Sequence, residues 1–144
     1  MKKAILVFVL TFLCLPFVSA HAAQVQDLTW TQLQAQMRGN PSQSVVIEFY
    51  SSKADGLDCD KCMQQSAVFS DVARRYGNDV AFVRIDVASV PFLIENGTVR
   101  IHPTHLFVRH DVPDGHEMVA RTIRGFLTAH QFEELIAGFF EVKP

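Results

Sequence analysis

Two cysteines are the residues of this chain best suited to chemistry. Cys59 and Cys62 stand three positions apart and open a stretch without proline or glycine that runs to Tyr76, with apolar residues at helical spacing. Cysteines so spaced at a helix start lie on one face, close enough for a disulfide, and the unpaired backbone N–H groups there favour a thiolate. The pattern predicts Cys59 as a nucleophile with a lowered pKa, and Cys62, one turn deeper, as the resolving thiol.

The N-terminal residues are expected to be removed. Lys2 and Lys3 precede an apolar run from Ala4 to Val18, which is followed by Ser19-Ala20-His21-Ala22, a pattern typical of a secretory signal peptide. We therefore predict a signal peptide over residues 1–22, cut after Ala22, and one domain over residues 23–144. The run is shorter than the roughly 20 residues of a membrane-spanning helix, which disfavours a retained anchor. A periplasmic or secreted location follows.

Removal of this segment leaves two cysteines. Cys14 would leave with the signal, and Leu13 precedes it where a lipoprotein would have a small residue, which disfavours lipidation. The mature chain then keeps Cys59 and Cys62 in an oxidising compartment, where a disulfide persists. The loop they would enclose is too short to restrain the unfolded chain much, so a purely structural staple explains the pair poorly.

A strand that is apolar on both faces precedes the cysteines. In the run from Val45 to Ser51, Val45, Ile47 and Phe49 face one way, and Val46 and Tyr50 face the other. Such a strand belongs inside an α/β sheet, covered on both sides.

The remaining chain supplies further strands and helices. A second strand, Val80 to Asp86, follows the cysteine helix, so the two strands should be parallel with a right-handed crossover. The other expected elements are a helix from the cap Thr29 to Met37, a short helix or turn over Pro91 to Glu95, a strand through Leu106 to Val108, a turn over Asp111 to Gly115, a hairpin strand over Met118 to Ile123, and a closing helix capped by Thr128. Ala23 to Asp27 is expected to be a lead without a partner.

Charge excludes one class of function. The formal net charge is −2, and loss of Lys2 and Lys3 would make the chain more acidic, so nothing favours a nucleic-acid partner. The chain has no repeats. A monomer without a cofactor is the default expectation for so small a domain.

The order of these segments resembles the thioredoxin-like superfamily over nearly all of the mature chain. The resemblance rests on Val46-Ile47-Glu48-Phe49-Tyr50, then C-x-x-C, then Ile101-His102-Pro103-Thr104, a hairpin, a glycine and a final helix. It implies a central mixed sheet with helices on both faces, and thiol–disulfide oxidoreductase activity on protein substrates, reset by a membrane redox partner.

The resemblance also assigns roles residue by residue. It implies a Cys59–Cys62 disulfide, and Pro103 as a cis-proline shaping a substrate groove with His102 and Thr104 beside it. Glu48 falls where family members have a buried acid that takes the resolving thiol's proton. The physics agrees, because burial of a carboxylate raises its pKa towards that of a useful base. The alternative is that Glu48 reaches solvent at a sheet edge.

Three departures from thioredoxin limit what can be carried over. Asp58 replaces the aromatic residue that usually precedes the first cysteine, and the loop from Ser51 to Asp58 is several residues longer. Phe82 falls where thioredoxin has a buried lysine. Local electrostatics and the partner surface therefore have to be determined for this chain.

The expected mechanism is thiol–disulfide exchange, with the Cys59 thiolate attacking a substrate disulfide and Cys62 resolving the mixed disulfide. Asp58 and Asp60 oppose ionisation of Cys59, whereas Lys61 and a protonated His102 favour it. Two acids against one lysine favour a reductase of periplasmic protein disulfides. His102 either makes the redox potential pH-dependent or simply fills its loop.

Two other classes of function stay open. Cys59, Cys62 and His102, with His105 as a further candidate, could bind Cu(I) or Zn(II), because thiolates and imidazoles suit both ions. Alternatively, the domain is an adaptor whose dithiol is incidental; a Cys59→Ser protein that still rescued a deletion strain would favour that hypothesis.

Overall fold

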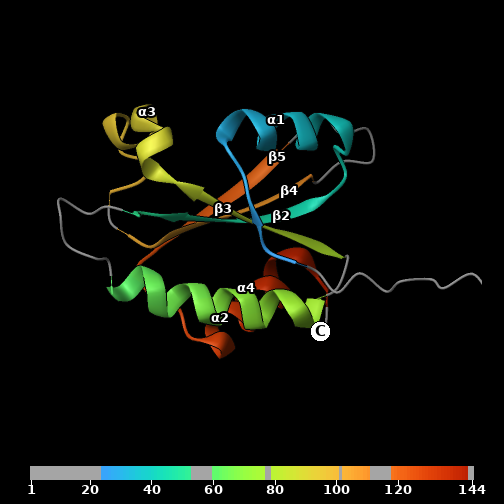
Figure 1. The fold of residues 1–144 in the computed structure, drawn as a ribbon. Coiled ribbons are helices and arrows are strands. Elements are labelled where there is room, and N and C mark those ends of the chain that lie inside the picture. Colours follow the sequence, from blue (N-terminus) through green and yellow to red (C-terminus); the bar gives the residue numbers. More distant parts are fainter. Residues whose placement is uncertain (1–23, 53–59, 77–78, 101, 111–117, 143–144) are drawn as a thin grey trace, which may run out of the picture.

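A five-stranded mixed sheet forms the centre of the molecule (Figure 1). The computed structural model describes residues 24–52, 60–76, 79–100, 102–110 and 118–142. The strand order is β1-β3-β2-β4-β5, with β1 and β3 parallel to their neighbours and β4 and β5 antiparallel. The strands are β1 (Gln26–Asp27), β2 (Ser44–Tyr50), β3 (Val80–Asp86), β4 (Thr104–His110) and β5 (Met118–Arg124). The predicted fold class and the parallel pair of β2 and β3 are confirmed.

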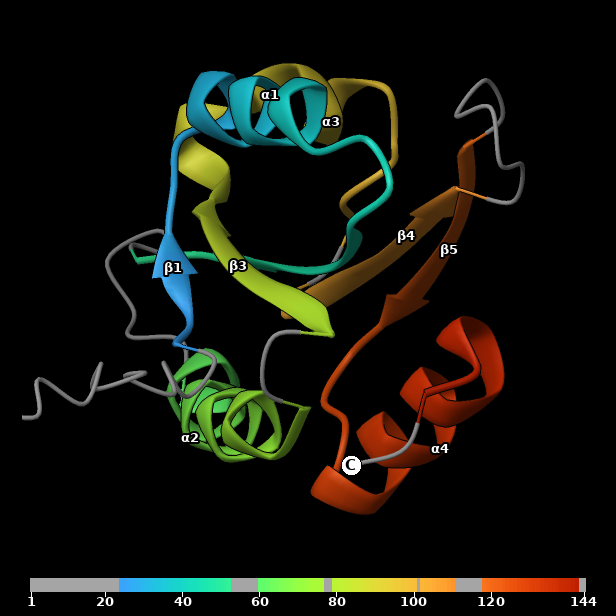
Figure 2. The same ribbon diagram turned by 90° about the vertical axis from the view of Figure 1, so that its right-hand side faces the viewer.

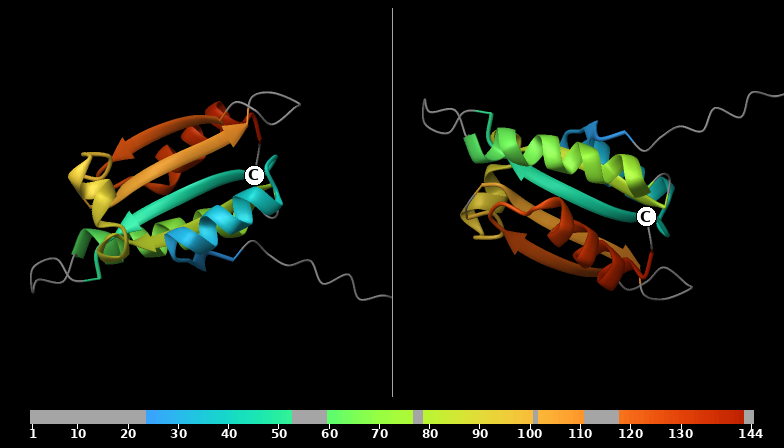
Figure 3. Two further views of the ribbon diagram at one scale, coloured as in Figure 1. Left: turned by 90° about the horizontal axis from the view of Figure 1, so that it is seen from above. Right: turned by 90° about the horizontal axis from the view of Figure 1, so that it is seen from below.

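The helices cover both faces of the sheet. Figures 1 and 2 show α1 (Trp30–Gly39) and α3 (Pro91–Glu95) on one face, and α2 (Asp60–Tyr76) and α4 (Ala129–Phe140) on the other. A short 3-10 helix, η1 (Val87–Ser89), joins β3 to α3. The views from above and below show each pair of helices lying on its own side of the strands (Figure 3). In the part of the chain that is described, no helix is long and apolar enough to cross a membrane.

The side chains of the central strand, β2, lie in two separate cores, because successive side chains of a strand point to opposite faces. Val45, Ile47 and Phe49 belong to the cluster under α1 and α3, whereas Val46 belongs to the cluster under α2 and α4. All four are at most 1% exposed. This is the two-sided burial that the apolar pattern predicts, and it places Glu48 in the sheet interior.

Two threonines begin helices as predicted. Thr29 and Thr128 each accept a hydrogen bond from the backbone N–H three residues on, and Gln32 and Gln131 reach back to the backbone N–H of the cap. These reciprocal bonds satisfy N–H groups that a helix start leaves unpaired. The first turns of α1 and α4 are therefore determined by residues that are close to them in the sequence.

One expectation about the strands is wrong. Gln26 and Asp27 are not an unpartnered lead: they pair in parallel with Val83 and Arg84 at the sheet edge. A two-residue strand is too short to show an alternating pattern, so its pairing depends on the neighbouring strand. The third predicted strand, through Leu106 to Val108, is confirmed; polar residues at both ends extend it, so that it runs from Thr104 to His110.

Several predicted features lie outside the described residues. These are the signal peptide over residues 1–22, Cys59 with the preceding Asp58, and the turn over residues 111–115.

Candidate redox site

Cys62 lies in the first turn of α2, where that helix starts beside the end of β2. Its side chain is buried, with 3% exposed, and the residue is disulfide-bonded. The expected partner, Cys59, is outside the described residues, so the Cys59–Cys62 pairing stays a prediction. The Cys62 sulfur is therefore largely shielded from external reagents.

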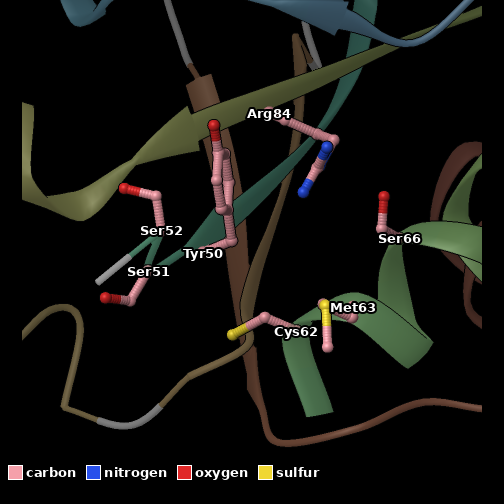
Figure 4. A pocket seen from close by; sticks show the side chains of 7 residues that line it. All are labelled: Tyr50, Ser51, Ser52, Cys62, Met63, Ser66 and Arg84. Atoms are coloured by element: carbon pink, nitrogen blue, oxygen red, sulfur yellow. The ribbon is translucent and has the colours of Figure 1, made fainter. Parts of the chain in front are cut away.

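A pocket of about 290 Å³ opens beside Cys62. Figure 4 shows its lining, which comes from the end of β2, the first turns of α2 and one residue of β3. The lining residues are Tyr50, Ser51, Ser52, Cys62, Met63, Ser66 and Arg84. Most of these side chains carry a polar atom, but most of the surface that they present to the pocket is apolar.

Glu48 is fully buried in the middle of β2, with 0% of the residue exposed. It lies two residues before Tyr50, so its side chain points to the same sheet face, the face covered by α2. Burial raises the pKa of Glu48 from 4.5 to about 7, and the nearby Arg84 guanidinium opposes that rise. A carboxyl group with this pKa exchanges its proton near neutral pH. The alternative of a solvent-reaching glutamate at a sheet edge is excluded.

Arg84 is the residue that the sequence reasoning missed. It lies opposite Glu48 in the parallel register of β2 and β3, and its Nε is 3.6 Å from Glu48 Oε1. The guanidinium also stacks on the Tyr50 ring, 4.1 Å from the ring centroid. One signal was available: Arg84 interrupts an apolar strand at a position two residues beyond Phe82. The cation near the buried acid is therefore present, but at a different position from thioredoxin's lysine.

The loop with Pro103 has the backbone geometry that the resemblance implies. The His102–Pro103 peptide bond is cis, and Pro103 is buried. The Pro103 carbonyl accepts a hydrogen bond of 2.8 Å from the Gly125 N–H, which ties this loop to the segment after β5. Gly125 has φ +93°, a conformation that side-chain-bearing residues rarely adopt, so glycine is required there.

The two residues flanking Pro103 differ in exposure. His102 is partly buried; burial lowers its pKa, and Asp86 opposes that effect. Thr104 is fully buried and pairs with Phe49 on β2 and Arg124 on β5. Their predicted place in a substrate groove stays a prediction.

His105 is fully buried on the same sheet face as Glu48 and lies opposite it in the register of β2 and β4. Its ring packs against Phe69 and Phe132, with ring centroids 6.3 and 4.8 Å away. Neither ring nitrogen has a hydrogen-bond partner among the described residues. Burial lowers the pKa of His105 to about 3, so the ring is neutral at physiological pH.

The described residues contain no group of three histidine, cysteine, aspartate or glutamate side chains that could hold a metal ion. The metal hypothesis also named Cys59, which is outside those residues.

Gln65 fixes the start of α2 against the loop after β5. Its fully buried amide donates to the Leu127 carbonyl at 3.0 Å and accepts from the Leu127 N–H at 2.6 Å. The residue lies three positions after Cys62, so this bridge holds the cysteine turn beside the Gly125 segment.

We expect Gln65→Leu to lower the free energy of unfolding by about 2 kcal/mol, because both Leu127 backbone groups lose their partner inside the protein. Urea unfolding would measure the loss. Gln64→Leu is the matched control, since Gln64 is exposed one position away, and its effect should stay within about 0.5 kcal/mol. Equal losses in both variants would show that the Leu127 bridge does not stabilise the fold.

Comparison with known proteins agrees with this architecture. The family model Thioredoxin matches residues 24–137, so the chain belongs to the thioredoxin family. It is similar to chloroplastic thioredoxin z, with 21% identity over 83% of this chain and 96% of that one, at a TM-score of 0.67. Thioredoxin from Schistosoma mansoni is 18% identical over 82% of this chain and 97% of that one, with a TM-score of 0.63. The Trx4 domain of ERdj5 has 18% identity, covering 83% and 96%, also at 0.63.

No curated protein sequence matches the chain significantly. At these identities the solved structures establish the fold alone.

Proposed function

We propose that this chain is a thiol–disulfide oxidoreductase that uses Cys59 and Cys62 as its dithiol. The observation that carries the proposal is the fully buried Glu48, whose ion-pair partner Arg84 lines the same pocket as Cys62. A core carboxyl group is costly to the fold and contributes nothing to packing, but its raised pKa makes it a suitable proton acceptor for a neighbouring thiol. The family membership supports the same chemistry.

The proposed reaction runs in two exchange steps. The Cys59 thiolate attacks one sulfur of a substrate disulfide, which breaks that S–S bond, forms a mixed disulfide and releases the first substrate thiolate. Cys62 then gives its proton to Glu48 and attacks the Cys59 sulfur. The Cys59–Cys62 disulfide forms, the second substrate thiolate leaves, and both released thiolates take protons from water. The substrate gains two electrons, which the dithiol loses.

The direction, location and partners belong to the same proposal. We infer a reducing role on protein disulfides in the periplasm, followed by renewal of the dithiol by a membrane partner. The acidic neighbours of Cys59 support this direction, since they stabilise the thiol rather than the thiolate. His102, beside the cis bond, would influence the potential only where it takes up a proton. Burial lowers its pKa, so that influence should appear below pH 6.5.

A test of the proposal uses the reduced mature protein. Alkylation rates followed against pH should reveal a thiol with a pKa below the free value of about 8.5, and mixing with glutathione disulfide should yield an intramolecular disulfide. The equilibrium with glutathione then gives the reduction potential. A value near that of thioredoxin, about −270 mV, would support a reductase, whereas one near −120 mV would indicate an oxidant. A thiol that titrates at about 8.5 and does not exchange would contradict the enzyme.

A further inference from the structure

Three different groups lie close to the Arg84 guanidinium. On one side its Nε is 3.6 Å from the buried carboxylate of Glu48, and on the other its Nη1 is 3.7 Å from Asp27 on β1. The guanidinium also lies over the Tyr50 ring. The Arg84 side chain is 18% exposed, whereas that of Glu48 is 0% exposed and that of Asp27 is 68% exposed. Arg84 therefore spans the distance from the sheet interior to the surface.

Arg84 also connects Glu48 to the cysteine. It is the one charged residue among the seven that line the pocket beside Cys62. Figure 4 shows its guanidinium extending from β3 into the space between Tyr50 and Ser66, above the turn that carries Cys62. The carboxylate itself is not part of the lining. Arg84 thus lies near Glu48 and also lines the pocket beside Cys62.

The other neighbours of Glu48 do not supply a compensating charge. His105, opposite it on β4, is neutral in its packed position between two phenylalanine rings. Phe82 and Val46 are apolar and fully enclosed on the same face. Asp27, beyond Arg84, is negative and acts against ionisation of Glu48. Of the described residues packed around this carboxylate, Arg84 is the one whose charge favours the ionised form.

We propose that Arg84 is a positioning residue for the resolving step: its nearby positive charge keeps the Glu48 carboxylate ionised, ready to accept the Cys62 proton. The inference rests on the proposed function. If Glu48 is already protonated, it cannot accept the proton of the Cys62 thiol. Cys62 would then attack the mixed disulfide only in the small fraction of molecules in which the Cys62 thiol has already ionised. The first attack, by Cys59, does not use this proton and should not depend on Arg84.

The test compares Arg84→Gln, Arg84→Lys and wild-type protein, with Arg74→Gln as the control. Arg74 is an exposed arginine of α2 whose ion-pair partner is Asp71, far along the helix from the cysteine. Carbon-13 NMR of the side-chain carboxyl group gives the titration midpoint of Glu48 in the reduced protein. Stopped-flow mixing with Ellman's reagent gives two phases of aryl thiol release, the first from attack by Cys59 and the second from resolution by Cys62.

In Arg84→Gln we expect the Glu48 midpoint to rise by about one pH unit from about 7, and the second phase at pH 7 to slow by about fivefold, in proportion to the ionised fraction of Glu48. The first phase should be unchanged, and raising the pH should restore the second. Arg84→Lys, which keeps the charge, should lie near wild type, and Arg74→Gln should match wild type in both measurements.

Three results would overturn the inference: an unmoved Glu48 midpoint in Arg84→Gln, a slowed second phase that higher pH does not restore, or an Arg84→Lys protein that behaves like Arg84→Gln. If Arg84→Gln fails to fold, the lysine variant decides, because its midpoint must then stay near that of wild type. The NMR titration is independent of turnover. A wild-type protein that does not react with the reagent at all would instead refute the proposed function.

Discussion

Replacing Cys62 with serine is expected to stop turnover and to leave the aryl thiol of Ellman's reagent attached to Cys59. The wild-type dithiol should release two equivalents of aryl thiolate, one for each exchange step. The variant should release one, because its serine cannot displace the second. In this variant the aryl thiol can be removed from Cys59 only by an external thiol, which is not held close to Cys59 as Cys62 is. We expect resolution by millimolar glutathione to be slower by at least about a thousandfold.

The structure explains why this variant should fold. Cys62 is 3% exposed in the first turn of α2, and serine has a similar size, so the turn and the Gln65 bridge behind it can stay in place. Mass spectrometry of the intact protein would detect the adduct. The control is a protein with both Cys59→Ser and Cys62→Ser, which should carry no adduct. Two equivalents released by Cys62→Ser, or an adduct on the double variant, would contradict the assigned order of attack.

The second large effect is expected in the pH dependence of stability, through His105. Burial lowers the pKa of this histidine from 6.5 to about 3, so the unfolded chain takes up a proton that the folded protein does not. Its contribution is fully present above pH 6.5 and is lost as the pH falls towards 3. Each pKa unit corresponds to about 1.36 kcal/mol, so the full loss of stability through His105 approaches about 5 kcal/mol.

Glu48 has the opposite effect on how stability changes with pH. Its pKa rises from 4.5 to about 7 on folding, so its contribution is fully present below pH 4.5 and is lost as the pH rises through 7, by about 3 kcal/mol. The two effects oppose each other between about pH 4.5 and 6.5. Stability should therefore change little across that range, fall steeply below it through His105, and fall again up to about pH 7 through Glu48.

Urea unfolding of His105→Leu and Glu48→Gln across pH 4 to 8 would measure both contributions. The stability of His105→Leu relative to wild type should improve by about 3 kcal/mol between pH 7 and pH 4, because the histidine no longer charges on unfolding. The stability of Glu48→Gln relative to wild type should instead improve as the pH rises from 4.5 to 7. His130→Leu is a suitable control, since His130 is exposed on α4. Curves that stay parallel to wild type would show that neither buried group titrates as described.

Most of the architecture follows from local patterns. Runs that are apolar on both faces identify β2 and β3 as interior strands, and Thr29 and Thr128, each with glutamine three residues on, identify two helix starts. The cysteine spacing at the start of α2 and the His102–Pro103 pair place the candidate site at one end of the sheet. These features are visible because a strand alternates with period two and a helix cap acts within one turn.

What the sequence by itself determined is therefore the class of fold and the interior position of β2; it left open whether the Glu48 side chain reaches solvent. Only the tertiary structure decided that Arg84, Glu48 and His105 stand side by side on three strands, that Asp27 pairs at the sheet edge, and that Gln65 bonds to Leu127. The physical reason is that register between strands depends on packing between segments far apart in the chain. The same local pattern is compatible with several registers, and each would give Glu48 different neighbours and a different pKa.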